Sequence, residues 1–327
     1  MILRESGRPT QEVLGSVSTS DLTTLAVGGP CLRYAEVHNQ VSFEQLSTDA
    51  KQAEIPILII GEGSNVLFSD EGFNGLLIRN RVSGKERMGR EVELGSGENL
   101  SQTIQWLNRQ ELSGMEKMFG IPGTVAGALV GNAGAYGQEI GDVVTEVDVL
   151  VDGELRTFSK RDLKLQYRHS TFKVHPGWFI VRCRLNLQNS REDLQSVSEA
   201  ILTKRRVKYP DGLKCPGSFF KNVRVSEISA AARRGLPEGF VLVEKIPAGK
   251  LLEAVGAQGV RRGDAQFADY HGNLIINRGH ATSEDILSLA NEYAGLVLHR
   301  FRIRLEPEIL IVDDSEWPYL RSVKDDA

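Results

Sequence analysis

Residues 119–137 constrain the fold of this chain more than any other stretch. They read Phe-Gly-Ile-Pro-Gly-Thr-Val-Ala-Gly-Ala-Leu-Val-Gly-Asn-Ala-Gly-Ala-Tyr-Gly, and ten of the nineteen are glycine or alanine. Side chains this small cannot fill a core, so the backbone itself must lie against another surface. That surface is either a closely packed element of the same protein or a flat or polyanionic cofactor. Residues 114–141 show no helical pattern, and we expect them not to be helical.

A second glycine-containing segment follows an aliphatic run. Ile57–Ile60 predicts a buried strand, and Gly61-Glu62-Gly63-Ser64-Asn65 comes directly after it. Glycines allow positive φ there, and successive N–H groups can then surround a phosphate. Taken alone, the loop fits a tight turn between two strands equally well. Two glycine segments in one chain favour a cofactor that carries a diphosphate.

The common phosphate-binding motifs are absent from the sequence. The sixth position of Gly61–Val66 is valine, where a Rossmann fingerprint needs its third glycine. No Gly-x4-Gly-Lys-Ser/Thr motif occurs anywhere in the chain. Leu67–Asp70 opens no helix, so we expect any phosphate bound by this loop to lie between strands rather than at a helix N-terminus.

Length, charge and cysteine content limit the class of protein. A chain of 327 residues is longer than a single hydrophobic core usually supports, which indicates two or three lobes. A net charge of −4 argues against a nucleic-acid partner, because neutralising phosphates needs a basic surface. No apolar run predicts a membrane span or a signal peptide. Cys31, Cys183 and Cys215 are odd in number and widely spaced, which indicates reduced thiols in a cytoplasmic protein without a metal site.

Periodicity predicts an α+β fold. We expect helices over residues 42–50, 99–107, 190–208, 248–256 and 283–298, and strands over 57–60, 91–95, 147–151, 179–181, 272–277 and 301–312. Ser42 is expected to cap the first helix in a capping box with Gln45, and Asn99 to cap the second. Ser190 is expected to begin the third. Residues 209–212, Tyr-Pro-Asp-Gly, predict a turn at a lobe boundary.

Several motifs along the chain occur in the order seen in the UDP-N-acetylenolpyruvoylglucosamine reductases. They are Thr24–Gly29, Gly61–Gly75, Ile121–Ala128, Tyr167–Lys173, Gly217–Asn222 and Leu305–Glu308. The chain therefore resembles this family over roughly residues 19–312, in the shorter subclass that lacks an additional tyrosine-bearing loop. The resemblance implies a two-part FAD-binding domain of the vanillyl-alcohol-oxidase type over residues 1–80 and 81–208. It also implies a C-terminal α/β substrate-binding domain over 209–306, with a strand in 307–327 returning to the first part.

The resemblance also implies a reaction and its binding residues. In this family NADPH reduces FAD, and the flavin N5 passes hydride to UDP-N-acetylglucosamine enolpyruvate, giving UDP-N-acetylmuramate for peptidoglycan. The residues that match the FAD site are Gly61, Gly63, Ser64, Asn65, Gly123, Thr124, Gly127, Ala128 and Gly134. The residues that match the substrate site are Tyr167, Arg205, Lys208 and Asn222. A cytoplasmic monomer that binds the UDP-sugar and NADPH is expected, without a membrane or nucleic-acid partner.

Three residues match the catalytic positions of the family. Ser218 matches the proton donor, and a hydroxyl can work as an acid only if its alkoxide is stabilised or its proton is relayed. Arg168 matches the arginine that pairs with the substrate carboxylate, for which a guanidinium fork is suited. Glu308 matches the glutamate near the C-terminus. Glu306 and Glu308 are expected on one face of a strand, with Pro307 at an edge or bulge.

Each of these residues also has a purely structural interpretation. Ser218 after Gly217 could be a turn serine, Arg168 a surface ion-pair residue, and Glu308 a solvated edge residue. Arg205 and Lys208 are three apart at a predicted helix end, where cations complement the helix dipole. Two other functions stay open. A flavin oxidase of the same fold would often tether FAD through a His or Cys, which is missing beside the glycine segments. A non-catalytic nucleotide-binding module would tolerate Ser218→Ala.

Overall fold

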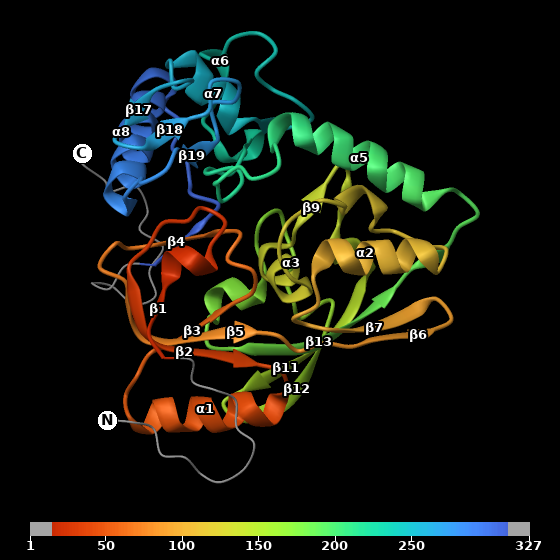
Figure 1. Cartoon of the computed structure of the whole chain (residues 1–327). Helices are drawn as coiled ribbons and strands as arrows, with labels where there is room; N and C mark the ends of the chain where they lie inside the picture. Colours follow the sequence, from red (N-terminus) through yellow and green to blue (C-terminus); the bar gives the residue numbers. More distant parts are fainter. Residues whose placement is uncertain (1–14, 313–327) are drawn as a thin grey trace. The chain divides into compact units, whose positions relative to one another are not determined.

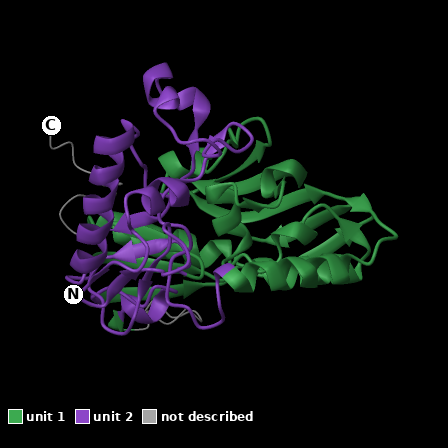
Figure 2. Ribbon diagram, turned by 90° about the horizontal axis from the view of Figure 1, so that it is seen from above, with its two compact units in different colours: residues 1–17, 31–62, 74–207 green, residues 18–30, 63–73, 208–327 purple. Residues whose placement is uncertain are grey.

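The computed structural model describes residues 15–312, which form two compact units (Figure 2). Among the described residues, unit 1 holds 15–17, 31–62 and 74–207, and unit 2 holds 18–30, 63–73 and 208–312. Each unit is thus assembled from segments far apart in the sequence. The predicted division at 80, 208 and 306 stays a prediction, and its parts 1–14 and 313–327 lie outside the described residues.

The first sheet of unit 1 has the order β1-β2-β5-β3. Its strands are β1 (Val17–Ser18), β2 (Pro30–Val37), β5 (Phe73–Asn80) and β3 (Ile57–Ile60), with β3 parallel to β5. Helix α1 (Gln40–Gln52) lies along one face of this sheet (Figure 1). It buries Phe43, Leu46 and Ala50 against the strands, and the Phe43 ring stacks on Phe179 with centroids 4.0 Å apart. The apolar face of α1 therefore stabilises β3, which ends at Ile60 directly before Gly61.

The second sheet of unit 1 is antiparallel with the order β12-β11-β13-β7-β6. Its strands are β12 (Glu154–Ser159), β11 (Val144–Val151), β13 (Phe179–Asn186), β7 (Glu91–Gly95) and β6 (Lys85–Met88). Helices α2 (Leu100–Arg109), α3 (Val125–Gly131) and α5 (Leu194–Lys208) belong to the same part of the chain (Figure 1). Buried side chains of α2 and α3 share one hydrophobic cluster with this sheet. The sheet thus carries the glycine-rich helix α3.

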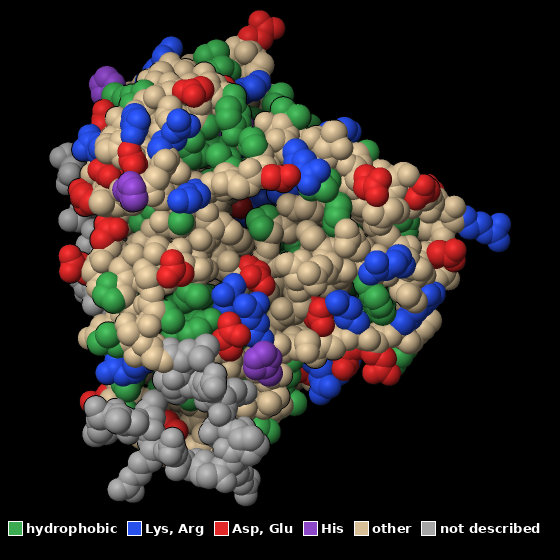
Figure 3. Space-filling model, viewed as in Figure 1, with side chains coloured by type: hydrophobic (Ala, Val, Ile, Leu, Met, Phe, Trp, Pro, Cys, Tyr) green, Lys and Arg blue, Asp and Glu red, His purple; other side chains and the backbone are tan. Residues whose placement is uncertain are grey.

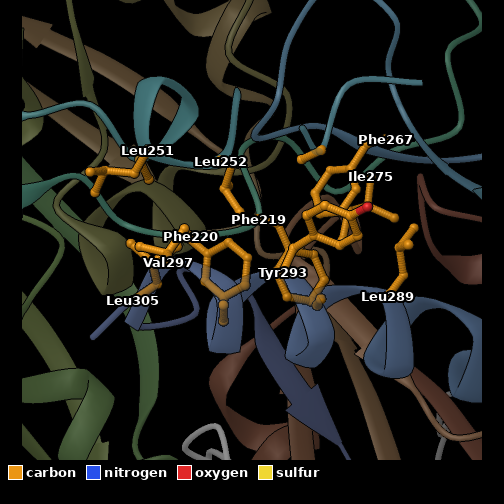
Figure 4. Packing of buried hydrophobic residues seen from close by; sticks show 14 of the residues in the cluster. Phe219, Phe220, Leu251, Leu252, Phe267, Ile275, Leu289, Tyr293, Val297 and Leu305 are labelled. Carbon is orange, nitrogen blue, oxygen red and sulfur yellow. The ribbon is translucent and has the colours of Figure 1, made fainter. Parts of the chain in front are cut away.

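Unit 2 is built around the long helix α8 (Ser283–Phe301) and the sheet β17-β18-β19. The strands of that sheet are β17 (Arg261–Arg262), β18 (Ala265–Phe267) and β19 (Ile275–Asn277). Helices α6 (Ala230–Arg234) and α7 (Ala248–Ala254) and the pairs β4 (Val66–Phe68) with β20 (Leu310–Val312) and β15 (Val223–Arg224) with β16 (Lys245–Ile246) complete it. Figure 4 shows its core, in which Phe219 and Phe220 pack with residues of α7, α8 and the sheet.

The remaining elements are short. In unit 1 they are β8 (Leu112–Ser113), β9 (Gly134–Ala135), β10 (Gln138–Glu139), β14 (Gln188–Asn189), α4 (Ile140–Val143) and the 3₁₀ turns Glu116–Met118 and Thr171–Val174. In unit 2 they are the 3₁₀ turns Thr19–Leu22 and Val225–Glu227. The fold is α+β, as the sequence predicts.

Several predicted elements are confirmed and others are corrected. Strands β3 and β7 and the Asn99 cap of α2 are confirmed, with Asn99 accepting a hydrogen bond from Gln102 N at 3.0 Å. The predicted Ser42 cap is wrong, because Asn39 caps α1 by accepting from Ser42 N at 3.0 Å. Helix α5 begins at 194 rather than at Ser190, since the Asp193 side chain accepts from Ser196 N. In both helices a competing side-chain acceptor nearby sets the start.

Two further expectations are wrong. Residues 114–141 were expected not to be helical, yet α3 forms within them under a Thr124 cap. The strand expected over 301–312 is confined to 310–312, because α8 continues to Phe301 and Arg302 then adopts a φ of 56°. Residues 306–308 consequently pair with Phe219–Lys221 through an isolated bridge rather than within a strand.

Lys and Arg side chains are interspersed with Asp and Glu side chains over the face in Figure 3. Within residues 15–312, none of the helices has the length and apolar character needed to span a membrane.

Candidate functional site

In unit 1, helix α3 presents bare backbone on one side. Gly127 and Gly131 are four residues apart and therefore share a helix face. A Cβ at Gly131 would have no neighbour within 4 Å, and one at Gly127 would meet only Thr124 Oγ1 at 3.5 Å. Ala128, in contrast, is 4% exposed and packs into the core. The open glycine face can accept a flat ring system at close range.

The first turn of α3 is fully engaged by protein oxygens. Val125 N donates to Glu98 O at 2.9 Å, Ala126 N to Ser96 O at 2.8 Å, and Gly127 N to Thr124 Oγ1 at 3.1 Å. These bonds hold the glycine-containing helix in place despite its low intrinsic helix propensity. The N–H groups of this turn are therefore committed to the fold rather than directed at an anion.

Gly61, at the end of β3, lies against the same helix cap. A Cβ at Gly61 would lie 2.5 Å from Thr124 Oγ1, so glycine is needed for this approach. Arg79 from β5 donates from Nε to Gly61 O at 3.1 Å and from Nη2 to Glu62 Oε2 at 2.8 Å. The structure thus brings the first half of the predicted phosphate loop together with the glycine segment of unit 1.

Tyr167 and Arg168 lie on a tight turn at the other end of α3. Gln166 and His169 exchange two backbone hydrogen bonds of 3.0 Å, and Arg168 between them has a φ of 54°. Asn132 Nδ2 donates to Gln166 O at 3.1 Å, which ties the turn to the C-terminal cap of α3. Arg168 Nη2 lies 3.5 Å from Gly134 O, and its guanidinium lies 5.3 Å from the Tyr167 ring centroid.

The second half of the phosphate loop belongs to unit 2. Gly63 has a φ of 63°, and a Cβ there would lie 2.0 Å from Leu22 O, so both the φ and the close packing favour glycine. Thr24 N donates to Gly63 O at 3.1 Å. Asn65 donates from Nδ2 to Glu308 O at 3.2 Å, and its own carbonyl accepts from Leu310 N. Ser64 between them is half-buried.

Ser218 lies at the edge of the unit 2 core and is held there by its neighbours. Gly217 before it has a φ of 89°, a conformation that disfavours other residues. Phe219 and Phe220 after it are each 1% exposed in the hydrophobic cluster of Figure 4. Asn273 accepts from Phe220 N at 2.9 Å and donates to Phe220 O at 2.8 Å. The serine backbone is thus fixed from both sides.

Two polar side chains meet at the Ser218 hydroxyl, and the Glu308 backbone lies beside the neighbouring residue. Lys208 Nζ donates to Ser218 Oγ at 3.2 Å, and Tyr209 OH lies 3.4 Å from the same oxygen. Glu308 lies in the segment that forms the isolated bridge, and its backbone N donates to Phe219 O at 2.8 Å. The structure therefore gathers Ser218, Lys208, Glu308 and Asn65 within unit 2.

Burial shifts the pKa values of His271 and Cys215 in unit 2. Burial, together with the positive charge of Lys208, lowers the pKa of His271 from its usual value to about 4. The His271 ring accepts a hydrogen bond at Nδ1 from Asn273 N at 3.0 Å. Burial raises the pKa of the Cys215 thiol. Both groups are therefore neutral at pH 7, and Lys208 supplies the positive charge at the serine.

Three other predicted residues have contacts or backbone conformations of their own. Asn222 Oδ1 accepts from Ala248 N at 3.1 Å, so this side chain helps to begin α7. Arg205 lies beside Gly120 in unit 1, where a Cβ would be 3.4 Å from its Cδ. Gly123, before the Thr124 cap, has a φ of 123°. Among the residues that the structure describes, no group of three His, Cys, Asp or Glu side chains is arranged to hold a metal ion.

Three residues that contact the predicted ones have no functional role in the sequence-based prediction. Tyr209 lies in the predicted turn at 209–212, Asn273 lies in the predicted strand at 272–277, and Arg79 has no predicted role. Tyr209 directly follows Lys208, and that adjacency was a usable signal. Asn273 and Arg79 are distant in sequence from Phe220 and Gly61, so no local pattern could connect them.

Comparisons with known proteins agree with one another. The family described as UDP-N-acetylenolpyruvoylglucosamine reductase, C-terminal domain, matches residues 209–312, and the FAD binding domain family matches residues 32–159. A UDP-N-acetylenolpyruvoylglucosamine reductase of Solibacter usitatus is 34% identical over 95% of this chain and 100% of its own length. One from Chloroflexus aurantiacus is 35% identical over 87% of this chain and 92% of its own length. The crystal structure of the Thermus caldophilus reductase matches 93% of this chain and all of its own, with a TM-score of 0.74 and 30% identity.

Proposed function

The chain belongs to the UDP-N-acetylenolpyruvoylglucosamine reductase family, and on this premise we propose how its own residues carry the reaction. It is an FAD- and NADPH-dependent UDP-N-acetylmuramate dehydrogenase of peptidoglycan synthesis, acting on a UDP-sugar. The observation that carries the site assignment is the hydrogen bond from Lys208 Nζ to Ser218 Oγ in unit 2, together with the backbone bond from Glu308 to Phe219 beside that serine. A serine whose oxygen accepts from a cation is suited to give up its proton.

The FAD-binding residues fit a bound flavin nucleotide. In unit 1 they are Gly61, Gly123, Thr124, Gly127, Ala128 and Gly134, and in unit 2 they are Gly63, Ser64 and Asn65. The open glycine face of α3 supports this proposal, because a Cβ there would occupy space that the backbone leaves clear. The chemistry that bound FAD would supply here is hydride transfer from NADPH to the substrate. The protein supplies binding, orientation and the proton.

The remaining residues act on the substrate. Ser218 donates a proton to the substrate carbon beside the carboxylate, and that carboxylate is held by Arg168. The turn anchored by Asn132 and the stacking on Tyr167 support this role, because they restrict the guanidinium before substrate binds. Glu308 polarises the substrate carboxyl group. Arg205, Lys208, Asn222 and Tyr167 contact the UDP-sugar, with the two cations facing its diphosphate.

The test of the proton donor separates the two halves of the reaction. Anaerobic stopped-flow follows flavin reduction by NADPH and, separately, flavin reoxidation by the enolpyruvyl UDP-sugar. In Ser218→Ala we expect reoxidation to slow by about 100-fold or more, the scale of one general acid, while reduction stays within about twofold. Ser226→Ala, an exposed serine of unit 2, is the matched control. Normal reoxidation in Ser218→Ala would refute the role of Ser218 and favour the non-catalytic module.

The oligomeric state and the cellular compartment of the protein are also proposals. We infer a monomer that works in the cytoplasm, and the three cysteines, all buried and free, support a reducing compartment. Sedimentation of the FAD-loaded protein at micromolar concentration would reveal a dimer if that inference were wrong.

A further inference from the structure

Ser218 Oγ has two hydrogen-bonding neighbours in unit 2, and the sequence predicted neither of them at this serine. Lys208 Nζ donates to it at 3.2 Å, and Tyr209 OH lies 3.4 Å from it. A hydroxyl oxygen accepts two hydrogen bonds and donates one. An ammonium is only a donor, so Oγ is the acceptor toward Lys208. If Tyr209 also donates, both acceptor sites of Oγ are filled and its single proton is directed elsewhere.

We propose that Tyr209 is a positioning residue for proton donation by Ser218, working with Lys208 on the same oxygen. This inference rests on the proposed role of Ser218 as proton donor. With both acceptor sites occupied, the serine O–H has one remaining direction, and the proposed role of Ser218 assigns that direction to the substrate carbon. Tyr209 thereby acts through Ser218 and does not itself touch the substrate.

The chemistry explains why a serine needs two such neighbours. As the Ser218 O–H bond breaks, its proton forms a C–H bond on the substrate, and the electron pair stays on Oγ. An alkoxide in a partly buried place is costly unless a cation and hydrogen-bond donors are already aimed at it. Lys208 then passes one N–H proton to Oγ, which restores the hydroxyl and leaves a neutral amine. That amine takes its proton from water.

The surroundings hold the Tyr209 ring in place. Tyr209 is half-buried and packs with the small hydrophobic cluster of Cys215, Ala268, Leu274 and Ile276. Its ring also faces the ammonium of Lys208, with Nζ 5.0 Å from the ring centroid. A phenol fixed by its ring loses little entropy when its hydroxyl engages Ser218. The ring and the hydroxyl therefore have separable roles.

The tyrosine-to-phenylalanine exchange separates those roles. Tyr209→Phe keeps the ring in its cluster and removes only the oxygen at 3.4 Å from Ser218. Tyr270→Phe is the matched control, because the Tyr270 hydroxyl donates to the Lys208 carbonyl at 3.2 Å and not to Ser218. Both variants are compared with wild type and Ser218→Ala as FAD-loaded full-length protein. Flavin content and the urea midpoint of each establish that folding is unchanged.

In Tyr209→Phe we expect flavin reoxidation by substrate to slow by about 10-fold, because Oγ then keeps only Lys208 to stabilise its developing negative charge. Reduction by NADPH and the dissociation constant of the substrate from oxidised enzyme should both stay within about twofold. The solvent deuterium isotope effect on reoxidation should rise, because proton delivery becomes more limiting. Tyr270→Phe should match wild type in all of these.

Two results would overturn the positioning role of Tyr209. One is reoxidation within twofold of wild type. The other is a slower reoxidation that is matched by a weaker substrate affinity, which would make Tyr209 a binding residue. Ser218→Ala distinguishes this failure from failure of the proposed function. If Ser218→Ala slows reoxidation and Tyr209→Phe does not, only the role of Tyr209 is lost. If Ser218→Ala itself is normal, the serine is not the proton donor.

Discussion

Asn273 connects the stability of unit 2 to the position of Ser218. Its side chain accepts from Phe220 N at 2.9 Å and donates to Phe220 O at 2.8 Å, and its exposed fraction is 2%. Asn273→Ala leaves both backbone groups of Phe220 without that partner in a buried place. Each buried backbone group without a hydrogen-bond partner destabilises the fold by about 1–3 kcal/mol, so the free energy of unfolding should fall by about 3 kcal/mol. The backbone bond from Phe219 N to Asn273 O does not involve the side chain and should persist.

Urea unfolding of the FAD-loaded protein measures this loss. With a slope of roughly 2 kcal/mol per M for the unit 2 transition, the midpoint should fall by about 1.5 M. The loosened Phe220 also releases Ser218 two residues earlier, so flavin reoxidation by substrate should slow while reduction by NADPH does not. Asn108→Ala in unit 1 is the control, because its amide donates to Leu194 O and Ser198 Oγ and is also buried.

Two outcomes would refute this reasoning. A midpoint for Asn273→Ala within about 0.3 M of wild type would mean that the two bonds to Phe220 contribute no net stability. Equal slowing of reoxidation by Asn108→Ala and Asn273→Ala would mean that general destabilisation, and not the anchoring of Ser218, is responsible.

Two further predictions concern His271 and Arg79. Because the folded protein holds the pKa of His271 near 4 and an unfolded histidine titrates near 6.5, the unfolded state binds more protons between these values and stability falls as pH decreases. The unfolding free energy, measured in urea, should therefore drop by about 1 kcal/mol more in wild type than in His271→Gln between pH 7 and pH 5. This value is reduced because the ring is partly exposed to solvent. Equal drops in the two proteins would contradict the prediction. Arg79→Gln should raise the FAD dissociation constant by about 10-fold, as measured by flavin fluorescence titration of the apoprotein, since Gly61 O loses its side-chain donor and Glu62 keeps only its ion pair with Arg81. Arg87→Gln, an exposed arginine of unit 1, should leave that constant unchanged, and equal effects in the two variants would remove the role of Arg79.

The sequence predicted those helices and strands that are determined by their own residues and immediate neighbours. The aliphatic run Ile57–Ile60 forms β3, and Asn99 caps α2 by its own side chain. Helix α3 was missed because its stability comes from elsewhere. Two glycines within it lower its intrinsic propensity, and Ser96 O and Glu98 O supply the partners for its first turn. Bonds to a segment some thirty residues earlier leave no periodic pattern in the helix itself.

In the candidate site, too, some residues could be predicted from neighbouring residues, and some contacts could not. Motif order gave Ser218, Arg168 and Glu308, since each lies in a run of characteristic residues. The isolated bridge that places Glu308 beside Phe219 could not be predicted, because it joins segments about ninety residues apart through backbone atoms alone. A strand was expected there because alternating Glu306 and Glu308 fit a period of two, which an isolated bridge also satisfies.

Lys208 shows how one side chain can serve two predicted tasks. The sequence predicts that Lys208 binds the substrate diphosphate, whereas in the structure Lys208 Nζ donates a hydrogen bond to Ser218 Oγ at 3.2 Å. An ammonium has three N–H donors, so a bond to Ser218 does not prevent others to phosphate oxygens. A shared cation makes substrate binding and proton supply depend on each other, and replacing Lys208 would alter both KM and kcat. The phenol of Tyr209 has no such second task in this proposal. For that reason Tyr209→Phe, rather than any change at Lys208, isolates the contribution of the hydrogen bonds at Ser218 from that of substrate binding.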